Sequence, residues 1–376
     1  MVIIFLKLDT KKYCKNFDLW YNNCNYYLGG KTNLKINIKN FTLDKLKEEL
    51  KTIGEKPFRA EQIFKWLFQD RVYSFDEMTN LSLDLRKKLD EKYRIGSFDI
   101  VRKLESKDGT KKYLFDIKDG KGNLIETVLM SYHHGYSVCV SSQIGCRMGC
   151  KFCASTGIPF ERGLEPGEIV EQLLAIEKDA GVKISNIVFM GVGEPLDNYE
   201  NVMDSIKIIN DPKALNIGAR HISISTSGLV PMIYKLADEK LQCTLSVSLH
   251  SSNNKTRSEM MPINNMYPIE ELMKACKYYI EQTNKRISFE YALAKDNNDN
   301  LKDAEDLVKL LKGMLAHVNL IPINKIESGK YTKSTNENII KFRDYLNEKG
   351  IVATIRRELG SDIDAACGQL RRKNLN

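Results

Sequence analysis

Cys146-Arg-Met-Gly-Cys150-Lys-Phe-Cys153 places three cysteines in one short run with the spacing C-x₃-C-x₂-C. Three thiolates on a tight loop suit an iron–sulfur cluster, because soft sulfur ligands favour iron–sulfur centres and zinc. Three ligands are one fewer than a four-iron cluster or a closed structural zinc site uses. The run therefore predicts a metal centre with one open position, where an iron could bind a small molecule and do chemistry on it.

A zinc knuckle whose fourth ligand lies elsewhere in the chain is the alternative. Zinc sites usually pair a C-x₂₋₄-C motif with a second close pair of Cys or His ligands. The sequence offers His133 and His134 as adjacent residues, whereas its other candidate ligands stand alone: Cys14, Cys24, Cys139, Cys243, Cys276, Cys367, His221, His250 and His317. This distribution favours the iron–sulfur centre over zinc.

The composition is that of an ordinary globular protein. A chain of 376 residues predicts two or three domains, and the 42% hydrophobic and 28% charged content is typical of globular domains. The sequence contains no run of 18 uncharged apolar residues, so we expect no membrane helix and no membrane partner. Nine cysteines, several of them in a metal motif, indicate a reducing cytoplasm. The net charge of +8 permits a polyanionic partner.

The N-terminal part divides into an extension and a helical region. Residues 1–32 show no clean periodicity. We expect either an extension of unknown role or a mis-assigned start codon. Residues 33–97 predict a helical domain, in which one helix presents Leu43, Leu46 and Leu50 on one face and Pro57 begins a second. A third helix is expected over about 82–93. Basic residues along this region predict either solvated faces or an RNA-contacting patch: Lys56, Arg59, Lys65, Arg71, Arg86, Lys87 and Lys88.

Strand patterns begin at residue 98. The segments 112–117 and 124–131 alternate in polarity and are joined by Asp119-Gly-Lys-Gly122, which predicts an antiparallel β segment over 98–136. From 137 to 376, strands alternate with amphipathic helices such as 169–176 and 304–311, which predicts an α/β fold with a parallel sheet. The expected parallel strands are 137–141, 186–190, 221–225, 243–249, 287–293, 317–321 and 352–355. Periodicity alone does not separate an open sheet from a barrel.

Polar motifs follow several of these strands. Gly191-Val-Gly193-Glu194-Pro195 follows the second strand, Ser225-Thr-Ser-Gly228 the third, Ser248-Leu249-His250 the fourth, and Asn324 lies just past the sixth. Each motif alone is typical of a tight turn or a polar loop. Because ligands of α/β barrels bind at the carboxyl ends of the strands, their common position predicts one ligand site at that rim.

Longer motifs occur in a fixed order along residues 34–372. They are Cys139-Val-Ser-Ser-Gln-Ile-Gly-Cys146, Met190–Leu196, Ser225–Gly228, Met261-Pro-Ile-Asn264, Val318-Asn-Leu-Ile-Pro322 and Asp362-Ile-Asp-Ala-Ala-Cys367-Gly-Gln-Leu370. With the cysteine triplet, they resemble the radical S-adenosylmethionine (SAM) superfamily and, within it, the RlmN type of dual-specificity adenosine-C2 RNA methyltransferases. The resemblance implies the partial (βα)₆ barrel of the radical SAM enzymes for residues 137–376.

The resemblance also implies the cofactors and their ligands. A [4Fe–4S] cluster is expected on Cys146, Cys150 and Cys153, and two SAM molecules are expected per turnover. The residues implied for the SAM site are Gly193, Glu194, Ser225, Ser248, Leu249, His250 and Asn324. Two RNA partners are implied: 23S ribosomal RNA, modified near the peptidyl-transferase centre, and transfer RNA, modified at the adenosine 3′ of the anticodon. The third implied partner is a flavodoxin-type electron donor. We expect a monomer.

Three catalytic residues follow from the same resemblance. Because C2 of adenine is not nucleophilic, the methyl group has to be carried first by a sulfur, and a thiolate is a good nucleophile for that step. The resemblance assigns this role to Cys367, the role of resolving thiol to Cys139 and that of general base to Glu126. From the residues alone, Cys139 could be a buried core cysteine, Cys367 could be a plain loop residue and Glu126 could face solvent.

Three rival functions stay open from the sequence. The first is a sibling enzyme that methylates C8 of the same adenosine with the same cluster and cysteines. The second is another radical enzyme such as a glycyl-radical activase, in which the C-terminal Cys367 motif would have no explanation. The third is a non-catalytic iron–sulfur protein that binds RNA and leaves SAM intact.

Overall fold

The computed structural model describes residues 35–324 and 330–365. Residues Asn37–Asn376 form one compact unit, and the other unit, Met1–Ile36, contributes only its last two residues to the described part. The predicted extension 1–32 and Cys367 therefore lie outside the described residues. The predicted domain boundaries at 97 and 136 stay predictions.

Three helices begin the described chain and confirm those expected for the helical region. They are α2 (Leu43–Thr52), α3 (Phe58–Phe68) and α4 (Leu83–Lys92), and the short strands β1 (Ile36–Asn37) and β2 (Tyr93–Arg94) flank them in the sequence. The hydroxyls of Thr42 and Ser82 accept hydrogen bonds from backbone N–H groups in the first turns of α2 and α4. Pro57 precedes α3, where its missing N–H leaves no hydrogen bond unmade.

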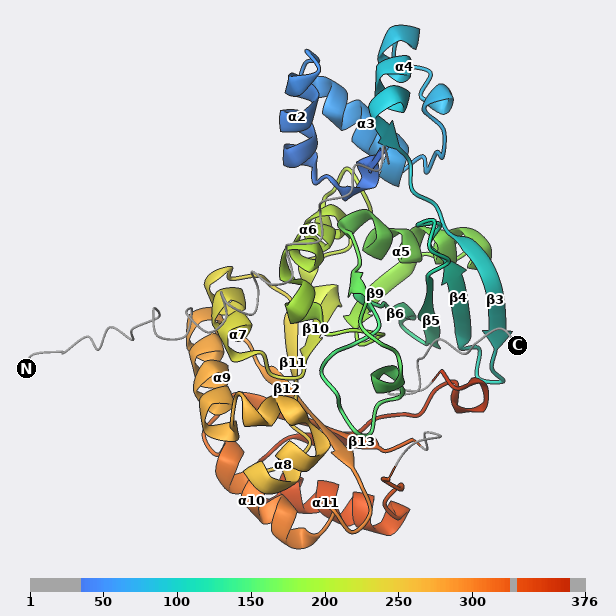
Figure 1. Cartoon of the computed structure of the whole chain (residues 1–376). Coiled ribbons are helices and arrows are strands. Elements are labelled where there is room, and N and C mark those ends of the chain that lie inside the picture. The colour runs from blue at the N-terminus through green and yellow to red at the C-terminus, as the bar shows by residue number, and fades with distance from the viewer. Residues whose placement is uncertain (1–34, 325–329, 366–376) are drawn as a thin grey trace, which may run out of the picture. The chain divides into compact units, whose positions relative to one another are not determined.

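Ten strands form one sheet in the order β14-β13-β12-β11-β10-β9-β6-β5-β4-β3 (Figure 1). The antiparallel strands are β3 (Asp99–Glu105), β4 (Lys111–Asp116) and β5 (Leu124–Tyr132), which pairs with β6. The parallel strands are β6 (Gly135–Cys139), β9 (Ile184–Phe189), β10 (Ile222–Thr226), β11 (Thr244–Ser248), β12 (Ile287–Leu293), β13 (Ala316–Pro322) and β14 (Ala353–Ile355). These strands confirm the expected α/β sheet and its antiparallel extension.

Helices connect the parallel strands in the order that a (βα)₆ arrangement requires. One follows each of the six strands before β14 and returns the chain to the amino end of the sheet, as right-handed crossovers do. They are α5 (Pro166–Ala180), α6 (Tyr199–Asn210), α7 (Val230–Asp238), α9 (Ile269–Thr283), α10 (Leu301–Leu311) and α11 (Asn336–Glu348), and α8 (Asn254–Met260) is an additional helix between β11 and α9. In the described part of the chain, β14 and β3 are the two edges of the sheet, so the barrel is partial.

The core lies between the parallel strands and these helices. Ile187, Leu245 and Phe289 on the strands and Leu173 and Leu307 on the helices have no exposed surface. Each such side chain contributes roughly 1.5–3 kcal/mol when fully buried. These strand side chains lie on one side of the sheet. Leu245 alternates with Ser246 and Phe289 alternates with Glu290, so the other side carries polar residues within the strands. Across residues 35–324 and 330–365, no helix combines the length and apolar character needed to cross a bilayer.

Candidate active site

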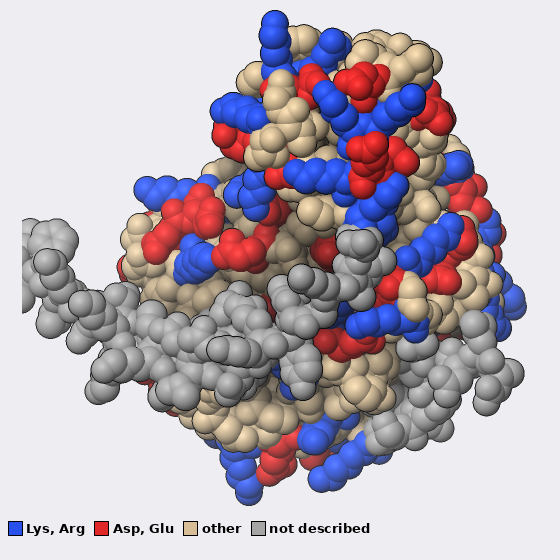
Figure 2. Space-filling model, turned by 45° about the horizontal axis from the view of Figure 1, so that its top comes forward, with Lys and Arg blue, Asp and Glu red and all other residues tan. Residues whose placement is uncertain are grey.

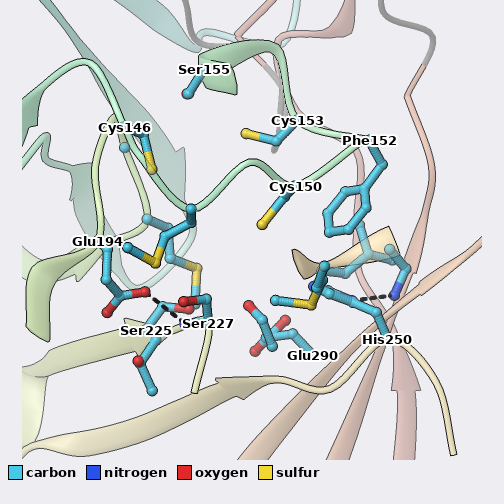
Figure 3. Close-up of a pocket in the computed structure, with 18 of the residues that line it drawn as sticks. Cys146, Cys150, Phe152, Cys153, Ser155, Glu194, Ser225, Ser227, His250 and Glu290 are labelled. Atoms are coloured by element: carbon cyan, nitrogen blue, oxygen red, sulfur yellow. Dashed lines mark hydrogen bonds between the residues drawn. The ribbon is translucent and has the colours of Figure 1, made fainter. Parts of the chain in front are cut away.

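The cysteine triplet lies on the loop between β7 (Gln143–Ile144) and β8 (Arg162–Gly163), two short strands that pair with each other. Gly145 begins the loop with φ +73°, and a Cβ there would lie 2.0 Å from the Pro159 carbonyl oxygen, so a side chain is excluded. The sulfurs of Cys146, Cys150 and Cys153 face one cavity (Figure 3). We call it the cluster cavity; the parallel strand ends form its opposite wall.

Burial favours the neutral form of these thiols. Burial raises the pKa of the Cys146 thiol to about 12, and the nearby charges of Glu194 and Cys153 add to that rise. Burial also raises the pKa of Cys150, as do its neighbours Cys153 and Cys146. Metal coordination deprotonates a thiol outright, so positive irons would reverse this preference for the neutral form. Among the described side chains, no three Cys, His, Asp or Glu converge as ligands of a single ion, whereas a four-iron cluster offers each thiolate its own iron.

A buried ion pair fixes the loop against the strand ends. Arg147 donates from Nε and Nη2 to the two carboxylate oxygens of Asp197, at 2.8 and 2.7 Å. Gln143 Nε2 donates to the same carboxylate at 2.8 Å. Because a bidentate guanidinium–carboxylate pair has a defined geometry, it orients the first turn of the cysteine loop. Asp197 belongs to the segment after β9, so the loop and that strand end form one structure.

The glycines after β9 allow a close approach of two backbones. A Cβ on Gly191 would lie 2.6 Å from the Val140 carbonyl oxygen, and one on Gly193 would lie 2.6 Å from Cβ of Gln143. Gly193 also has φ +107°, which favours glycine. This packing brings Glu194 into the cluster cavity, as Figure 3 shows.

Glu194 is a buried carboxylate with defined partners. Its Oε2 accepts a hydrogen bond from the Ser227 N–H at 2.7 Å, and its Oε1 accepts one from the Leu196 N–H at 3.0 Å. Burial raises its pKa, although these hydrogen bonds oppose the rise. A positively charged ligand group in the cavity would compensate the buried negative charge.

The structure brings together all but one of the residues predicted for the SAM site. Six line the cluster cavity: Gly193, Glu194, Ser225, Ser248, His250 and Asn324. Leu249 does not line it, because its side chain is fully buried in the hydrophobic core and its N–H donates to the Glu290 carbonyl oxygen at 3.0 Å.

His250 is held as a neutral ring. Its Nδ1 accepts the Ala292 N–H at 2.9 Å, so the single proton of the neutral imidazole lies on Nε2. Burial lowers its pKa to about 3, and the positive charge of Arg257 lowers it further. The ring packs edge-on against Phe152 of the cysteine loop at 4.7 Å between centroids. His250 is thus a hydrogen-bond donor in a wall that contacts the cluster loop.

Two charged residues in the cavity wall were missed by the sequence reasoning. Glu290 of β12 accepts a hydrogen bond from Asn319 Nδ2 at 2.8 Å and lies 3.8 Å from Nη1 of Arg356, which follows β14. Burial raises the pKa of Glu290. The sequence signal was present, since both residues lie in or just after predicted strands, but neither belongs to a motif that marks it.

A second cavity, which we call the cysteine cavity, adjoins the first. Cys139 at the end of β6 lines it, as do Val128, Met130, Leu359 and Ala365. The two cavities share four wall residues: Met190, Ile321, Asn324 and Arg356. Ala365 is the last described residue of the C-terminal segment and precedes Cys367 by two positions. Cys139 is therefore buried, as expected of a core cysteine, but it also borders a cavity beside the cluster site.

Glu126 is buried, so the alternative of a solvent-facing carboxylate does not hold. Its Oε1 lies 2.9 Å from Nζ of Lys112, and both side chains are nearly inaccessible. Lys112 Nζ also donates to the Asp364 carbonyl oxygen at 3.0 Å. Val128 pairs with Cys139 across β5 and β6, and Glu126 precedes Val128 by two residues, so all three side chains share one face of the sheet.

The basic residues of the helical region divide into two groups. Arg71 pairs with the buried carboxylate of Glu177 on α5, and Arg86 donates to the Asp76 carbonyl oxygen at 2.9 Å. Both contacts are structural. Lys56, Lys65 and Lys87 are exposed. Figure 2 shows Lys and Arg interspersed with Asp and Glu over the described surface, so the charge there is mixed and forms no uniform basic face in that view.

Comparisons with known proteins agree with this geometry. Residues 36–95 match the family model of the ribosomal RNA large subunit methyltransferase N-terminal domain, and residues 140–311 match the radical SAM superfamily. The chain is 54% identical over 337 residues to a probable dual-specificity RNA methyltransferase RlmN of Clostridium novyi (strain NT), covering 89% of this chain and 98% of that protein. A probable RlmN of Clostridioides difficile (strain 630) is 55% identical over 340 residues, with 90% and 98% covered.

A solved structure extends the similarity to three dimensions. The crystal structure of a radical SAM methyltransferase from Sphaerobacter thermophilus superposes with a TM-score of 0.84 at 43% sequence identity. The match covers 90% of this chain and 100% of that one, so it includes both the sheet and the helical region in outline.

Proposed function

This chain belongs to the RlmN family of radical SAM RNA methyltransferases, and we propose that it methylates C2 of one adenosine in the peptidyl-transferase region of 23S ribosomal RNA and of the adenosine 3′ of the anticodon in transfer RNAs. The observation that carries the proposal is the junction of the two cavities. Three thiols and the strand-end ligands line the cluster cavity, and Cys139 lines the adjoining one.

Enzymes of this family use a [4Fe–4S] cluster and two SAM molecules per turnover. We assign the cluster to Cys146, Cys150 and Cys153, because their thiols face one cavity and a fourth protein ligand is not required. When bound and reduced, the cluster and SAM supply a 5′-deoxyadenosyl radical, which removes hydrogen from a methyl group. We assign the ammonium group of SAM to Glu194, because its buried carboxylate accepts hydrogen bonds from the neutral N–H groups of Leu196 and Ser227 and a cation in the cavity would compensate its charge.

Cys367 carries the methyl group. Its thiolate attacks the methyl carbon of one SAM molecule, which is a substrate in this step. A bond forms between that carbon and the Cys367 sulfur, the bond from the carbon to the sulfonium breaks, and S-adenosylhomocysteine leaves. The methyl carbon, once it has lost a hydrogen atom, bonds to C2 of the adenine and joins the RNA to the Cys367 sulfur. The position of Ala365 in the cysteine cavity supports this role, because only one residue separates it from Cys367 in the sequence.

Release of the RNA requires a base and a second thiol. The unpaired electron of the adduct would return to the oxidised cluster, and Glu126 accepts the C2 proton. The Cys139 thiolate attacks the Cys367 sulfur, which forms a disulfide and breaks the bond between that sulfur and the methylene carbon; this carbon keeps the electron pair and takes up a proton to become the methyl group. The shared sheet face of Glu126 and Cys139 supports this pairing of roles. Lys112 links the Glu126 carboxylate to the backbone of Asp364, so the candidate base and the C-terminal segment are held by one ammonium group.

The remaining assignments concern the setting of the reaction. We place the enzyme in the cytoplasm, where its RNA substrates and a reducing environment for Cys139 and Cys367 are found. It acts as a monomer that receives electrons from a flavodoxin-type protein. The helical region contacts RNA through exposed lysines such as Lys56, Lys65 and Lys87, because phosphate contacts need cations that are free of structural partners.

Product analysis tests the function. The anaerobically purified and reconstituted protein is incubated with SAM, dithionite and 23S RNA fragments or transfer RNA, and the RNA is digested to nucleosides for mass spectrometry. We expect 2-methyladenosine together with 5′-deoxyadenosine. Exclusive 8-methyladenosine would assign the chain to the sibling reaction, and RNA binding without release of 5′-deoxyadenosine would show a non-catalytic protein.

A further inference from the structure

Arg257 of α8 is fully buried, although it lies outside the wall of the cluster cavity. Its guanidinium donates four hydrogen bonds, at 2.8–3.1 Å. Nε reaches the carbonyl oxygen of Leu249, and Nη2 reaches those of Ser227 and Ser248. Nη1 reaches the side-chain oxygen of Asn264. One side chain thus binds two separate loops and the turn that follows its own helix.

Both loops belong to the SAM site. Ser227 follows β10 and donates its N–H to Glu194, and Ser248 ends β11 two residues before His250. The carboxyl end of a parallel strand leaves carbonyl groups that the sheet does not pair. A planar guanidinium with five donors in a fixed fork can satisfy several of them at once, which an ammonium group cannot do in the same geometry. Arg257 therefore sets the spacing between the ends of β10 and β11.

The same helix supports the cysteine loop. The Lys151 N–H donates to the carbonyl oxygen of Met260, the last residue of α8, at 2.9 Å. A Cβ on Gly149 would lie 3.4 Å from Cγ of Pro262 in the next turn. Residues 149 and 151 flank Cys150, so α8 and the turn after it contact the loop on both sides of that cysteine. The helix that carries Arg257 thus joins the cluster ligands to the SAM-binding strand ends.

The positive charge of Arg257 acts on the cluster site separately from its hydrogen bonds. All of its hydrogen-bond acceptors in the described part of the chain are neutral oxygens. Burial lowers its pKa to about 10, which is still far above neutral pH, so the group stays positive. The helix that carries this charge and the turn after it contact the loop on both sides of Cys150, through Lys151 and Gly149, so the charge lies near the cluster ligands. A buried cation without a carboxylate partner is costly unless a nearby negative group compensates it, and thiolate-bound iron is such a group.

We propose that Arg257 is a positioning residue of the radical centre: its guanidinium holds the ends of β10 and β11 at the spacing that SAM requires, and its positive charge beside Cys150 favours the reduced cluster. This inference rests on the proposed function only in that the chain binds a cluster and SAM. RNA specificity does not enter it.

Two variants separate the hydrogen-bonding geometry of the Arg257 guanidinium from its positive charge. Arg257→Lys keeps a positive charge but cannot reach four oxygens, and Arg257→Gln removes the charge as well. The exposed Arg220→Gln is the matched control. Three quantities are measured for each reconstituted protein: the iron and sulfide content, the dissociation constant of SAM, and the midpoint potential of the SAM-bound cluster. The potential is obtained by titration with dithionite followed by electron paramagnetic resonance.

We expect both Arg257 variants to bind SAM at least tenfold more weakly than the wild type. In Arg257→Gln, the equilibrium constant of one-electron reduction should fall by about tenfold, which corresponds to 59 mV. Arg257→Lys should keep the wild-type potential. A wild-type SAM dissociation constant in Arg257→Lys would overturn the positioning role.

A wild-type potential in a cluster-loaded Arg257→Gln protein would overturn the role of the charge. If Arg257→Gln takes up no cluster, Arg257→Lys decides the proposal. A wild-type SAM dissociation constant in Arg257→Lys refutes it, and weaker SAM binding supports it. None of these measurements uses RNA. A wild-type protein that binds SAM and is reduced, but makes no 2-methyladenosine, would therefore count against the proposed function alone.

Discussion

Glu194 shows how one side chain can combine a structural and a binding role. Its carboxylate accepts N–H groups from two segments, at Leu196 and Ser227, and so fixes the turn after β9 against the turn after β10. The same burial that makes these bonds strong also raises its pKa, because an unpaired charge is disfavoured away from water. A ligand with a positive group gains most from such a carboxylate.

Glu194→Gln tests this role. The glutamine amide has nearly the same shape but no charge, and its NH₂ group would face one of the two N–H donors. Loss of a charged hydrogen bond costs about 1.5–3 kcal/mol, so we expect SAM to bind roughly ten- to a hundredfold more weakly. Isothermal titration under anaerobic conditions measures this, with the exposed Glu348→Gln as control.

The pH dependence gives an independent check on Glu194. A carboxyl group whose pKa is raised becomes protonated, and loses its attraction for an ammonium group, at a higher pH than an exposed glutamate. In the wild type, SAM binding should therefore weaken on acidification while the pH is still above the ordinary glutamate value of about 4.3. A flat affinity profile down to that pH, or an unchanged affinity in the glutamine variant, would contradict the assignment.

Cys139→Ala separates the formation of the RNA adduct from its release. Without the resolving thiol, we expect 5′-deoxyadenosine to form but methylated RNA to fall at least a hundredfold, because the RNA stays bound to Cys367. A slow-migrating RNA–protein band on a denaturing gel, sensitive to both nuclease and protease, reports the adduct. Cys243→Ala is the control, since Cys243 is also buried but lies outside both cavities. Normal turnover of the Cys139 variant without an adduct would remove Cys139 from the mechanism.

Residues at strand ends were predictable from the sequence when a motif marked them. Gly193, Glu194, Ser225 and His250 were found because glycines, small hydroxyls and a histidine follow predicted parallel strands, where the physics of α/β sheets places ligands. Their contacts were not predictable. Lys112, the partner of Glu126, lies 14 residues before it in the sequence, and Asp364, whose carbonyl oxygen Lys112 also binds, lies 238 residues after Glu126. No local pattern encodes such a pairing.

At the scale of elements, the sequence predicted the positions of the strands better than the contacts between the segments that connect them. Alternation of polarity and short apolar runs located the parallel strands and the β4–β5 hairpin within a few residues of the observed bounds. What escaped prediction was the docking of the C-terminal segment on the β3–β4 turn. Ser106 donates its hydroxyl hydrogen to Asp362 at 2.6 Å, and the Gly360 N–H donates to Asp108 at 2.9 Å. Single turn residues make these contacts, and turn residues carry no periodic signal.

Asp108→Ala tests whether this turn holds the catalytic segment. The wild-type carboxylate accepts N–H groups from Gly360 and Thr110, and the variant loses both bonds. Because Asp108 is exposed, we expect a loss of only about 1 kcal/mol in docking of the segment. That loss should lower the rate of RNA methylation about three- to tenfold and leave SAM affinity unchanged. Asp116→Ala, which removes a similar bond to the Lys118 N–H in the next turn, is the control.

The titration of Asp108 should not be seen in the activity profile. Burial alone would raise its pKa, but hydrogen bonds from Gly360 and Thr110 hold it at about 2, below its ordinary value of 3.8. A lowered pKa contributes stability above the unfolded value, and that contribution is lost only as pH falls from about 4 toward 2. Equal methylation rates in the Asp108 and Asp116 variants would show that the turn does not position the segment.

At the scale of the whole molecule, buried polar contacts join the helical region to the sheet domain. Nζ of Lys39, before α2, lies 2.6 Å from the carboxylate of Glu171 on α5, and both side chains are almost completely buried. Tyr73 donates its hydroxyl hydrogen to the same carboxylate at 3.0 Å. A third contact is largely exposed on one side, where Lys45 on α2 pairs with Asp204 on α6. A region held in this way is expected to present its exposed lysines at a fixed distance from the cavities, whereas a flexible tether would not.

Lys39→Met tests the coupling. Removing one partner of a buried pair leaves an uncompensated charge on Glu171, so we expect a loss of about 3–5 kcal/mol in the free energy of unfolding. The double variant Lys39→Met/Glu171→Leu should recover part of that loss, since no buried charge remains. Lys51→Met removes an exposed pair with Glu48 and should cost at most about 1 kcal/mol. Urea unfolding followed by circular dichroism measures all four proteins.

The same unfolding curves show whether the two regions form one cooperative unit. Trp66 lies on α3, so its fluorescence in a Trp20→Phe background reports the helical region, while circular dichroism reports mainly the larger sheet domain. In the wild type the two transitions should coincide, because breaking the interface exposes the Lys39–Glu171 pair. In Lys39→Met the fluorescence transition should move to lower urea and separate from the other. If both probes still coincide at the wild-type midpoint, the buried pair does not join the regions, and the position of the exposed lysines must be set by other contacts.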